Sequence, residues 1–401
     1  MNPHLIPRRP QQRGLRLWPV GLVLAATFAF AVLVAAGVFL AGWDLLGARG
    51  LKTQDRLDAK TLFDLVKLAF GVVAGAGALV ALVVAYRRQR VDEDGALREA
   101  TRLHTERFTT AVSQLGEESA AVRLGGVHAL AGLAADAPTD LLRQTCIDVL
   151  CAYLRLPYTA EAVPPDDDTA HHAYLASREV RHTIIRLIRD RLAVGPEDFA
   201  ASWQGYDLDF TGVVFDGGDF TGVVFAPGSM VTFRGARFAD GTVSFTRAQF
   251  CGGTVVFDGA CFSGSTVYFD DAEVSGGTVR FVGARFSRGE VEFARSRFSG
   301  GTIDFSMSHF SGGEVDFTQV QFSGGTVDFA YAQFSRGGTV GFKRTQISAG
   351  TVHFVRAHFS GSTISFEGAE GPAPMGLLRG PGEPLPVGLG GVPATWLWSA
   401  T

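Results

Sequence analysis

The chain is poor in cysteine and nearly balanced in charge. Its 401 residues include four cysteines, none in a Cys-x-x-Cys or zinc-ligand spacing: Cys146, Cys151, Cys251 and Cys261. Thiols so few and so scattered exclude a disulfide framework, and their scarcity favours a reducing compartment. The formal net charge of −4 gives no reason to expect nucleic acid or anionic lipid as the main partner.

Common catalytic motifs are missing as well. We find no metal-binding histidine pair at helical spacing, no G-x-S-x-G elbow and no phosphate-binding glycine loop followed by lysine. His171 and His172 lie beside the run PPDDD, where a solvated surface loop is favoured over a metal site. Cys146 and Cys151 lie on an apolar helical stretch without an evident catalytic partner, which is typical of buried structural cysteine. The sequence therefore predicts no enzyme activity, no cofactor and no metal.

Two long apolar runs dominate residues 1–90. Residues 18–43 contain no charge and have tryptophan at both ends, and residues 68–86 form a second run of spanning length. We interpret both as transmembrane helices. A cleaved signal peptide is the competing interpretation of the first run, but its apolar core is too long for one.

Basic residues around the two runs indicate the orientation. Seven arginines lie in the outer flanks and four basic residues in the loop: Arg8, Arg9, Arg13, Arg16, Arg87, Arg88 and Arg90, against Arg49, Lys52, Arg56 and Lys60. Because cytoplasmic segments carry the excess of Lys and Arg, we expect a multi-pass plasma-membrane protein. Its N-terminus and its C-terminal body would both be cytoplasmic.

Residues 91–198 are predicted to form a small helical domain. Apolar residues recur at helical spacing in two faces: Phe108, Val112 and Leu115, then Val127, Leu130 and Leu133. Further amphipathic stretches at 141–158 and 178–193 are separated by the breaker-rich AEAVPPDDDTA.

From Tyr206 onward phenylalanine recurs in a fixed rhythm, and the chain holds 32 Phe and 50 Gly. The spacing is first five residues and then alternates between five and seven: Phe210, Phe215, Phe220 and Phe225, then Phe238, Phe245, Phe250, Phe257, Phe262 and Phe269, continuing to Phe322. Two positions before each large residue stands a small or β-branched one, as in the triplets VDF and AQF. Such triplets are short strands whose first and third side chains both point inward.

The segments between the triplets are corners of two and four residues, such as AY after Phe329 and SGGT after Phe322. Glycine allows the positive backbone angles that tight corners need. A single twelve-residue unit would enclose a perimeter of only about 40 Å, too little for two Phe and two smaller side chains. Two units per coil, with four faces, give enough room. The repeat therefore predicts a parallel β-solenoid over residues 206–370.

This pattern resembles the pentapeptide-repeat family, which implies a right-handed quadrilateral parallel β-helix with large central residues and small residues two positions earlier. The order of two membrane spans, the segments ERFTTAVSQLG, VRLGGVHALAGLA and TCIDVLCAYLRLPY, and then Phe-rich pentapeptides resembles membrane-associated pentapeptide-repeat proteins common in actinobacteria. The resemblance implies no established activity.

Three classes of function follow from this reading. The first and favoured one is a membrane-anchored scaffold whose solenoid faces bind another protein. The second is a DNA mimic that binds gyrase, but residues 206–370 hold 17 Asp and Glu against 12 Lys and Arg, which is little charge for a mimic. The third is an exported adhesive or ice-binding solenoid, suggested by the Thr column of GGTV; the sequence lacks its paired Thr-x-Thr rows and disulfides.

Candidate partner-binding residues are the outward middle residues of the Val-type triplets: Glu292, Asp304, Asp316 and Asp328. Two units per coil stack Asp304 on Asp328, and Glu292 on Asp316 on the opposite face, with like charges roughly 5 Å apart. We expect that folding does not require these carboxylates. A solvated acidic surface is the favoured interpretation, because exposed charges usually have no further role, and the sharper hypothesis is that the ladders bind a basic partner surface near the membrane.

The two ends of a solenoid need covers because their strand edges are unpaired. Trp203, just before the first coil, is the candidate for the N-terminal end. Residues 371–401 are rich in Gly and Pro and are predicted to form a disordered tail, with the alternative that the segment ATWLW covers the C-terminal end.

Overall fold

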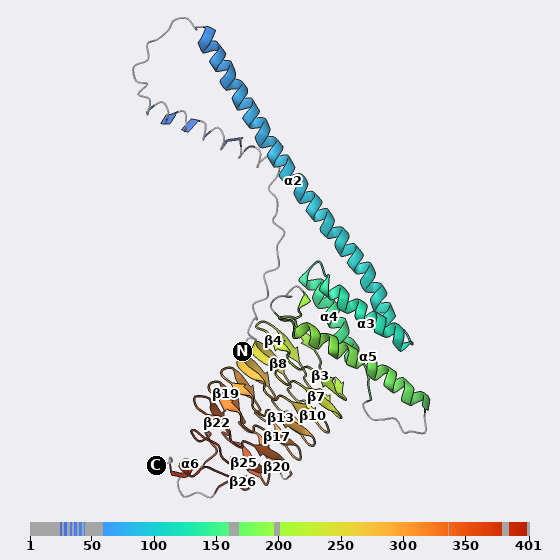
Figure 1. The fold of residues 1–401 in the computed structure, drawn as a ribbon, viewed down its shortest axis with the longest axis vertical. Coiled ribbons are helices and arrows are strands. Elements are labelled where there is room, and N and C mark those ends of the chain that lie inside the picture. The colour runs from blue at the N-terminus through green and yellow to red at the C-terminus, as the bar shows by residue number, and fades with distance from the viewer. Residues whose placement is uncertain are drawn as a thin grey trace. The chain divides into compact units, whose positions relative to one another are not determined.

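The structure is a computed structural model, shown in Figure 1, that describes residues 59–159, 168–195, 201–335, 337–378 and 385–398 and a few isolated positions between 25 and 44. The chain divides into two compact units, Met1–Ala100 and Thr101–Thr401. Its order is helical first, with α2 (Ala59–Leu115), α3 (Ala120–Ala135), α4 (Asp140–Leu154) and α5 (Asp168–Leu192), then a long series of strands, and finally α6 (Ala394–Trp398).

One helix among the described residues is long and apolar enough to cross a membrane. It is the part of α2 from Val66 to Leu115, and none of its most apolar window is buried in the protein. The second predicted run, 68–86, lies within it, whereas the first, 18–43, lies almost wholly outside the described residues. Among the described residues there is therefore one candidate span, which corresponds to the second predicted run.

The helix does not end where the apolar run ends. Beyond Tyr86 it continues through a polar stretch supported by pairs one turn apart, such as Arg102 with Glu106 at 2.7 Å. Its last turns bury Ala111 and Leu115, whereas Val112, which we expected on the buried face, is 37% exposed. The reason is that α3 approaches along the Ala111 side, where a Cβ on Gly126 would lie 2.8 Å from the Ala111 carbonyl oxygen.

The predicted parallel β-solenoid is confirmed. Its strands are short and regularly spaced: β1 (Leu208–Asp209), β2 (Val214–Phe215), β3 (Gly218–Asp219), β4 (Val224–Phe225), β5 (Met230–Thr232), β6 (Arg237–Phe238), β7 (Thr242–Ser244), β8 (Gln249–Val256), β9 (Cys261–Phe262), β10 (Thr266–Tyr268), β11 (Glu273–Arg280), β12 (Arg285–Phe286), β13 (Glu290–Glu292), β14 (Arg297–Phe298), β15 (Thr302–Asp304), β16 (His309–Phe310), β17 (Glu314–Asp316), β18 (Gln321–Phe322), β19 (Thr326–Asp328), β20 (Gln333–Ser335), β21 (Thr339–Gly341), β22 (Gln346–Ile347), β23 (Thr351–His353), β24 (His358–Ser360), β25 (Thr363–Ser365) and β26 (Leu389–Gly390). The seven-stranded sheet from β2 to β24 takes one strand from each turn, so the solenoid has about seven turns.

The register confirms two repeat units per coil. Phe286 pairs with Phe310, and Val267 pairs with Val291, 24 positions further along the chain. One later coil is a residue longer, since Glu314 pairs with Thr339 across the corner that contains Gly337 and Gly338. β8 and β11 run through the four-residue corner without a break, so two faces of the coil join in one eleven-stranded sheet.

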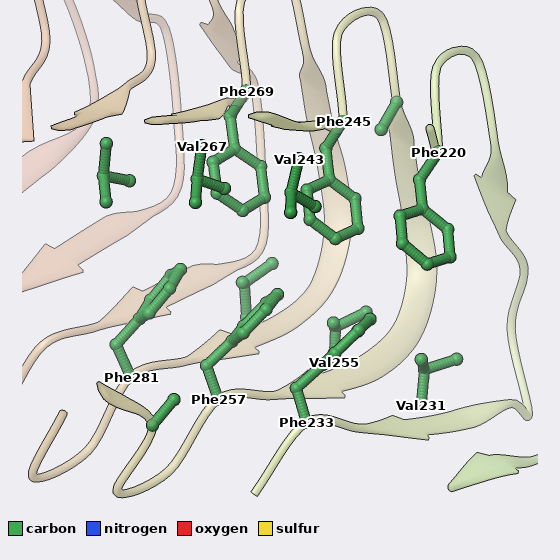
Figure 2. Packing of buried hydrophobic residues seen from close by; sticks show 14 of the residues in the cluster. Phe220, Val231, Phe233, Val243, Phe245, Val255, Phe257, Val267, Phe269 and Phe281 are labelled. Atoms are coloured by element: carbon green, nitrogen blue, oxygen red, sulfur yellow. The ribbon is translucent and has the colours of Figure 1, made fainter. Parts of the chain in front are cut away.

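Phenylalanine rings stack along the inside of the solenoid. Figure 2 shows one column of Phe220, Phe245 and Phe269, and a second of Phe233, Phe257 and Phe281. Within each column the ring centroids are 4.6–4.9 Å apart and the planes lie within 6° of parallel. This distance equals the spacing of neighbouring strands, so each coil places its rings directly on those of the previous coil.

Both ends of the solenoid are covered. Trp203 is fully buried before the first coil, and its amide nitrogen donates to the Arg191 carbonyl oxygen at 3.0 Å. At the other end β26 pairs with β25. The ring of Trp396 in α6 is 2% exposed, packs on Phe366 at 5.2 Å, and donates to the Gly371 carbonyl oxygen.

The segment expected to be a disordered tail is thus ordered over residues 371–378 and 385–398, and ATWLW covers the last coil as the alternative predicted. Burial of Trp396 and Leu377, the pairing of β26 with β25 and backbone hydrogen bonds such as Met375 to Val352 together oppose the entropy of ordering a Gly- and Pro-rich stretch.

Candidate functional site

The four candidate carboxylates stack as the coil length requires. Asp304 of β15 pairs with Asp328 of β19, and Glu292 of β13 pairs with Asp316 of β17. The two pairs belong to different sheets, so they lie on separate faces of the solenoid. All four side chains are partly buried.

We did not expect these carboxylates to take part in the fold, but the side chains of the three aspartates form hydrogen bonds within it. Oδ1 of Asp304 accepts hydrogen bonds from the amide of Ser306 at 2.9 Å and from its hydroxyl at 2.5 Å. Asp316 accepts from the Thr318 amide at 3.1 Å, and Asp328 from the Ala330 amide at 2.9 Å. Each aspartate therefore caps the two-residue corner that follows its strand, as an Asx turn does.

The face of Asp304 and Asp328 carries charges of both signs. Arg280 pairs with Asp304 in the preceding coil, and His353 pairs with Asp328 in the following one. The Arg280 guanidinium forms an ion pair with Asp258 at 3.1 Å and places a positive charge in the coil next to Asp304. This face is consequently a poor match for a strongly basic surface.

The opposite face is acidic over two coils. Glu290 stacks on Glu314 in the same strands that stack Glu292 on Asp316, so four carboxylates form two rows of two. We call Glu290, Glu292, Glu314 and Asp316 the acidic patch. Sequence reasoning missed Glu290 and Glu314, although the signal was present: each replaces the Thr of GGTV, in RGEVEF and GGEVDF.

Electrostatics within the acidic patch are unfavourable. Burial and then the charges of Asp270, Glu290, Asp316 and Glu314 raise the pKa of Glu292. Burial likewise raises the pKa of Asp270, partly opposed by Arg295, whose Nη2 lies 3.3 Å from Asp270 Oδ2. A cationic group brought to this face would relieve the repulsion.

A second group of polar residues joins the helices to the first coil. Asp216, whose side chain is 4% exposed, accepts hydrogen bonds from Tyr158 Oη at 2.6 Å, Tyr174 Oη at 3.1 Å, Arg178 Nε at 3.1 Å and His182 Nε2 at 3.0 Å. Burial alone would raise the pKa of Asp216, but the hydrogen bonds from His182 and Tyr158 and the nearby positive charge outweigh it. The pKa therefore lies well below its ordinary value.

Other contacts reinforce this junction. The side-chain amide of Gln144 donates to the carbonyl oxygen of Asp207 at 2.8 Å and accepts from its amide at 3.1 Å. It therefore satisfies both backbone hydrogen-bonding groups of this residue at the exposed edge of the first coil. Arg155 bonds Asp209, and Arg189 bonds Asp219. Because these contacts join α4, α5 and the loop after α4 to the solenoid, this helical part is a lid for its first coil.

Cys146 has a neighbour that the sequence did not reveal. Its Sγ lies 3.8 Å from Nε2 of His104, and both residues are buried. Burial raises the pKa of the Cys146 thiol to about 11 and lowers the pKa of His104. The pair is accordingly a neutral thiol beside a neutral imidazole, which fits a packing role and not an activated nucleophile.

His171 and His172 lie near the start of α5 and not in a loop as we expected. Their rings are 6.4 Å apart, and His171 also lies 6.5 Å from Tyr174. Within the part of the chain that the structure describes, no group of three His, Cys, Asp or Glu side chains could hold a metal ion.

The solenoid of about seven turns, with its regular Phe spacing, is typical of pentapeptide repeats. In comparisons with known proteins, no family model, no curated protein and no solved structure matches the chain.

Proposed function

We propose that the chain is a non-enzymatic, membrane-anchored scaffold whose β-solenoid binds another protein. The acidic patch is the observation that carries this proposal. Glu290 and Glu314 are exposed, and among the described residues neither carboxylate takes part in a hydrogen bond or an ion pair with arginine. The partner would present Lys or Arg side chains at a spacing close to that of the coils, about 4.8 Å.

The fold and the anchor belong to the same proposal. We propose that the solenoid has the right-handed quadrilateral form of the pentapeptide-repeat family and that the chain groups with membrane-associated members common in actinobacteria. Four strand segments per coil and the inward Phe columns support this. The multi-pass plasma-membrane location, with a cytoplasmic N-terminus and C-terminal body, rests on the apolar helix and on the seven-to-four distribution of basic residues.

A charge reversal tests the binding face. Glu290→Lys with Glu314→Lys should abolish crosslinking and capture of the partner from native membranes, with a thermal melt close to that of the wild type. The matched control is Glu273→Lys with Glu370→Lys, which changes the charge equally at exposed positions outside the acidic patch. A variant that lacks the solenoid measures the background level of capture. Unchanged capture after the first reversal would remove the acidic patch as the binding face.

The orientation of the chain in the membrane can be tested separately. Limited proteolysis of intact spheroplasts should spare residues 91–401 and should cut, if anywhere, between Asp44 and Lys60. Digestion of the solenoid from outside would reverse the orientation and support the exported alternative.

One observation partly favours the exported adhesive or ice-binding solenoid. Thr254, Thr278, Thr302, Thr326 and Thr351 stack in five consecutive coils. The outward residues beside them are not a second Thr row but include Arg280, Asp304 and His353, which a flat threonine surface would not tolerate. The gyrase-binding alternative is disfavoured because acidic residues dominate only two coils of one face; a supercoiling assay with purified gyrase would test it.

A further inference from the structure

A small cavity lies among the helices of the second unit, away from the acidic patch. Its volume is about 280 Å³. The end of α2, the start of α3, the end of α4 and the middle of α5 each contribute to its lining: Leu115, Gly116, Glu117, Arg123, Tyr153, Leu156, Pro157, Tyr158, Ser177 and Arg181. Leu115 and Arg181 are buried, whereas Glu117, Leu156 and Pro157 form an exposed rim.

Two arginines face this cavity, and neither forms an ion pair with a described residue. Arg181 is 3% exposed. Its Nη1 donates to the Leu154 carbonyl oxygen at 2.7 Å, and its Nη2 donates to the Val214 carbonyl oxygen at 2.8 Å. Its guanidinium carbon lies 4.1 Å from the ring centroid of Tyr158. Neutral partners thus hold a buried positive charge in place.

Arg123 differs because its hydrogen bonding is incomplete. Its Nε is buried and has no hydrogen-bond partner among the described residues. A buried donor without an acceptor is unfavourable, and a bound water or ion is one of the explanations for such a group in a native protein. The guanidinium fork matches the oxygens of a carboxylate or a phosphate.

The remaining lining sets the size and polarity of the ligand. Leu115, Leu156 and Pro157 present apolar surface, Tyr153 and Tyr158 present aromatic rings, and Ser177 adds a hydroxyl. A volume slightly below the usual range for ligand sites, about 300–1,000 Å³, suits a single ring and is too small for a nucleotide.

We propose that this cavity binds a small organic anion, a carboxylate or phosphate monoester on a monocyclic body, with Arg123 as the principal ligand of its oxygens. Tyr158 connects the cavity to the solenoid, since it lines the cavity and also donates to Asp216 of the first coil at 2.6 Å. Occupancy should therefore stabilise the junction between the helices and the first coil.

Calorimetric titration of the full-length chain in detergent tests the site, with phenyl phosphate and benzoate as probes. Both should bind and raise the melting temperature, and inorganic phosphate, which lacks the ring, should bind more weakly. Arg123→Met should reduce the affinity for phenyl phosphate about tenfold or more, because it removes a charged hydrogen bond. Arg285→Gln, an exposed arginine on the solenoid, should leave the affinity unchanged.

Stability without any probe separates binding from a structural role of Arg123. Arg123→Met removes an unpartnered buried donor, so the unliganded variant should melt at or above the temperature of the wild type. A fall of several degrees would show that Arg123 holds the fold together and would overturn the assignment. Absence of binding by both ring probes, or equal affinity of Arg123→Met and wild type, would overturn it as well. If inorganic phosphate binds as tightly as phenyl phosphate, the apolar wall has no role and the proposed ligand class is wrong.

Discussion

The rings of Phe281 and Phe305, on successive coils, lie 4.7 Å apart at their centroids with planes 8° from parallel. Phe305 is fully buried and stacks again on Phe329 at 5.0 Å. Each interior ring is therefore shared between neighbouring coils, and a single defect reaches beyond its own coil.

Phe305→Asp should destabilise at least two neighbouring coils. Loss of the ring alone costs about 3–5 kcal/mol, and a buried carboxylate without a partner adds to this. Phe305→Leu, which keeps most of the apolar volume, should cost only about 1–1.5 kcal/mol. Thermal melts followed by circular dichroism compare the two. Equal melting temperatures for Phe305→Asp and wild type would contradict the interior position.

The coil length could be predicted because the inward residues carry the repeat and alternate residues of a strand face the same side. The role of Asp304 as a cap of its corner could not be predicted, since its side chain reaches the amide of Ser306 only after the corner has taken its shape. The packing of the helices on the first coil could not be predicted from the sequence either. The partners of Asp216 lie 34 positions away at His182 and 58 positions away at Tyr158, and no local pattern joins residues so far apart.

Gly324 should be intolerant of any side chain. It lies in a four-residue corner where a Cβ would come 2.3 Å from the Ser299 carbonyl oxygen of the previous coil. Gly324→Ala must push two coils apart and should cost about 2–3 kcal/mol of unfolding free energy.

The matched control is Gly259→Ala, because Gly259 has a φ of +65° with nothing within 4 Å of an added Cβ. Only the left-handed backbone opposes that change, at about 1–2 kcal/mol. Denaturation by urea measures both variants. A Gly259→Ala variant less stable than Gly324→Ala would mean that backbone strain, and not the approach of the coils, selects glycine in this solenoid.

Met307 should be replaceable by glycine with a gain in stability. It occupies the second position of a two-residue corner at a φ of 58°, where earlier coils have Gly259 and Gly283 at 65° and 66°. Its side chain is 53% exposed, so little packing is lost. Relief of about 1–2 kcal/mol of left-handed strain exceeds the added entropy of an unfolded glycine, about 0.5–1 kcal/mol.

Met307→Gly should therefore raise the unfolding free energy by about 0.5–1 kcal/mol, measured by urea denaturation. Met307→Ala keeps the strain and serves as its control, with an expected change close to zero. A stabilisation by alanine equal to that by glycine would place the effect in the methionine side chain and not in the backbone.

The last prediction concerns acid stability and Asp216. The folded-state pKa of Asp216 lies below its unfolded value of about 3.9, so its ionised form is favoured by folding. The stabilisation that it contributes is fully present above about pH 4. It is lost as the pH falls from there toward the folded-state pKa, because the unfolded chain binds the proton first.

Asp216→Asn keeps the shape of the side chain but removes the charge that Arg178 and His182 meet at 3.1 and 3.0 Å. This variant should be less stable than wild type at pH 7 by about 3 kcal/mol, and the difference should shrink steadily below pH 4. Melting temperatures of the two proteins across pH 2–7 measure this difference directly. A difference that stays constant over the whole range would show that the charge of Asp216 is not what holds the helical lid on the first coil.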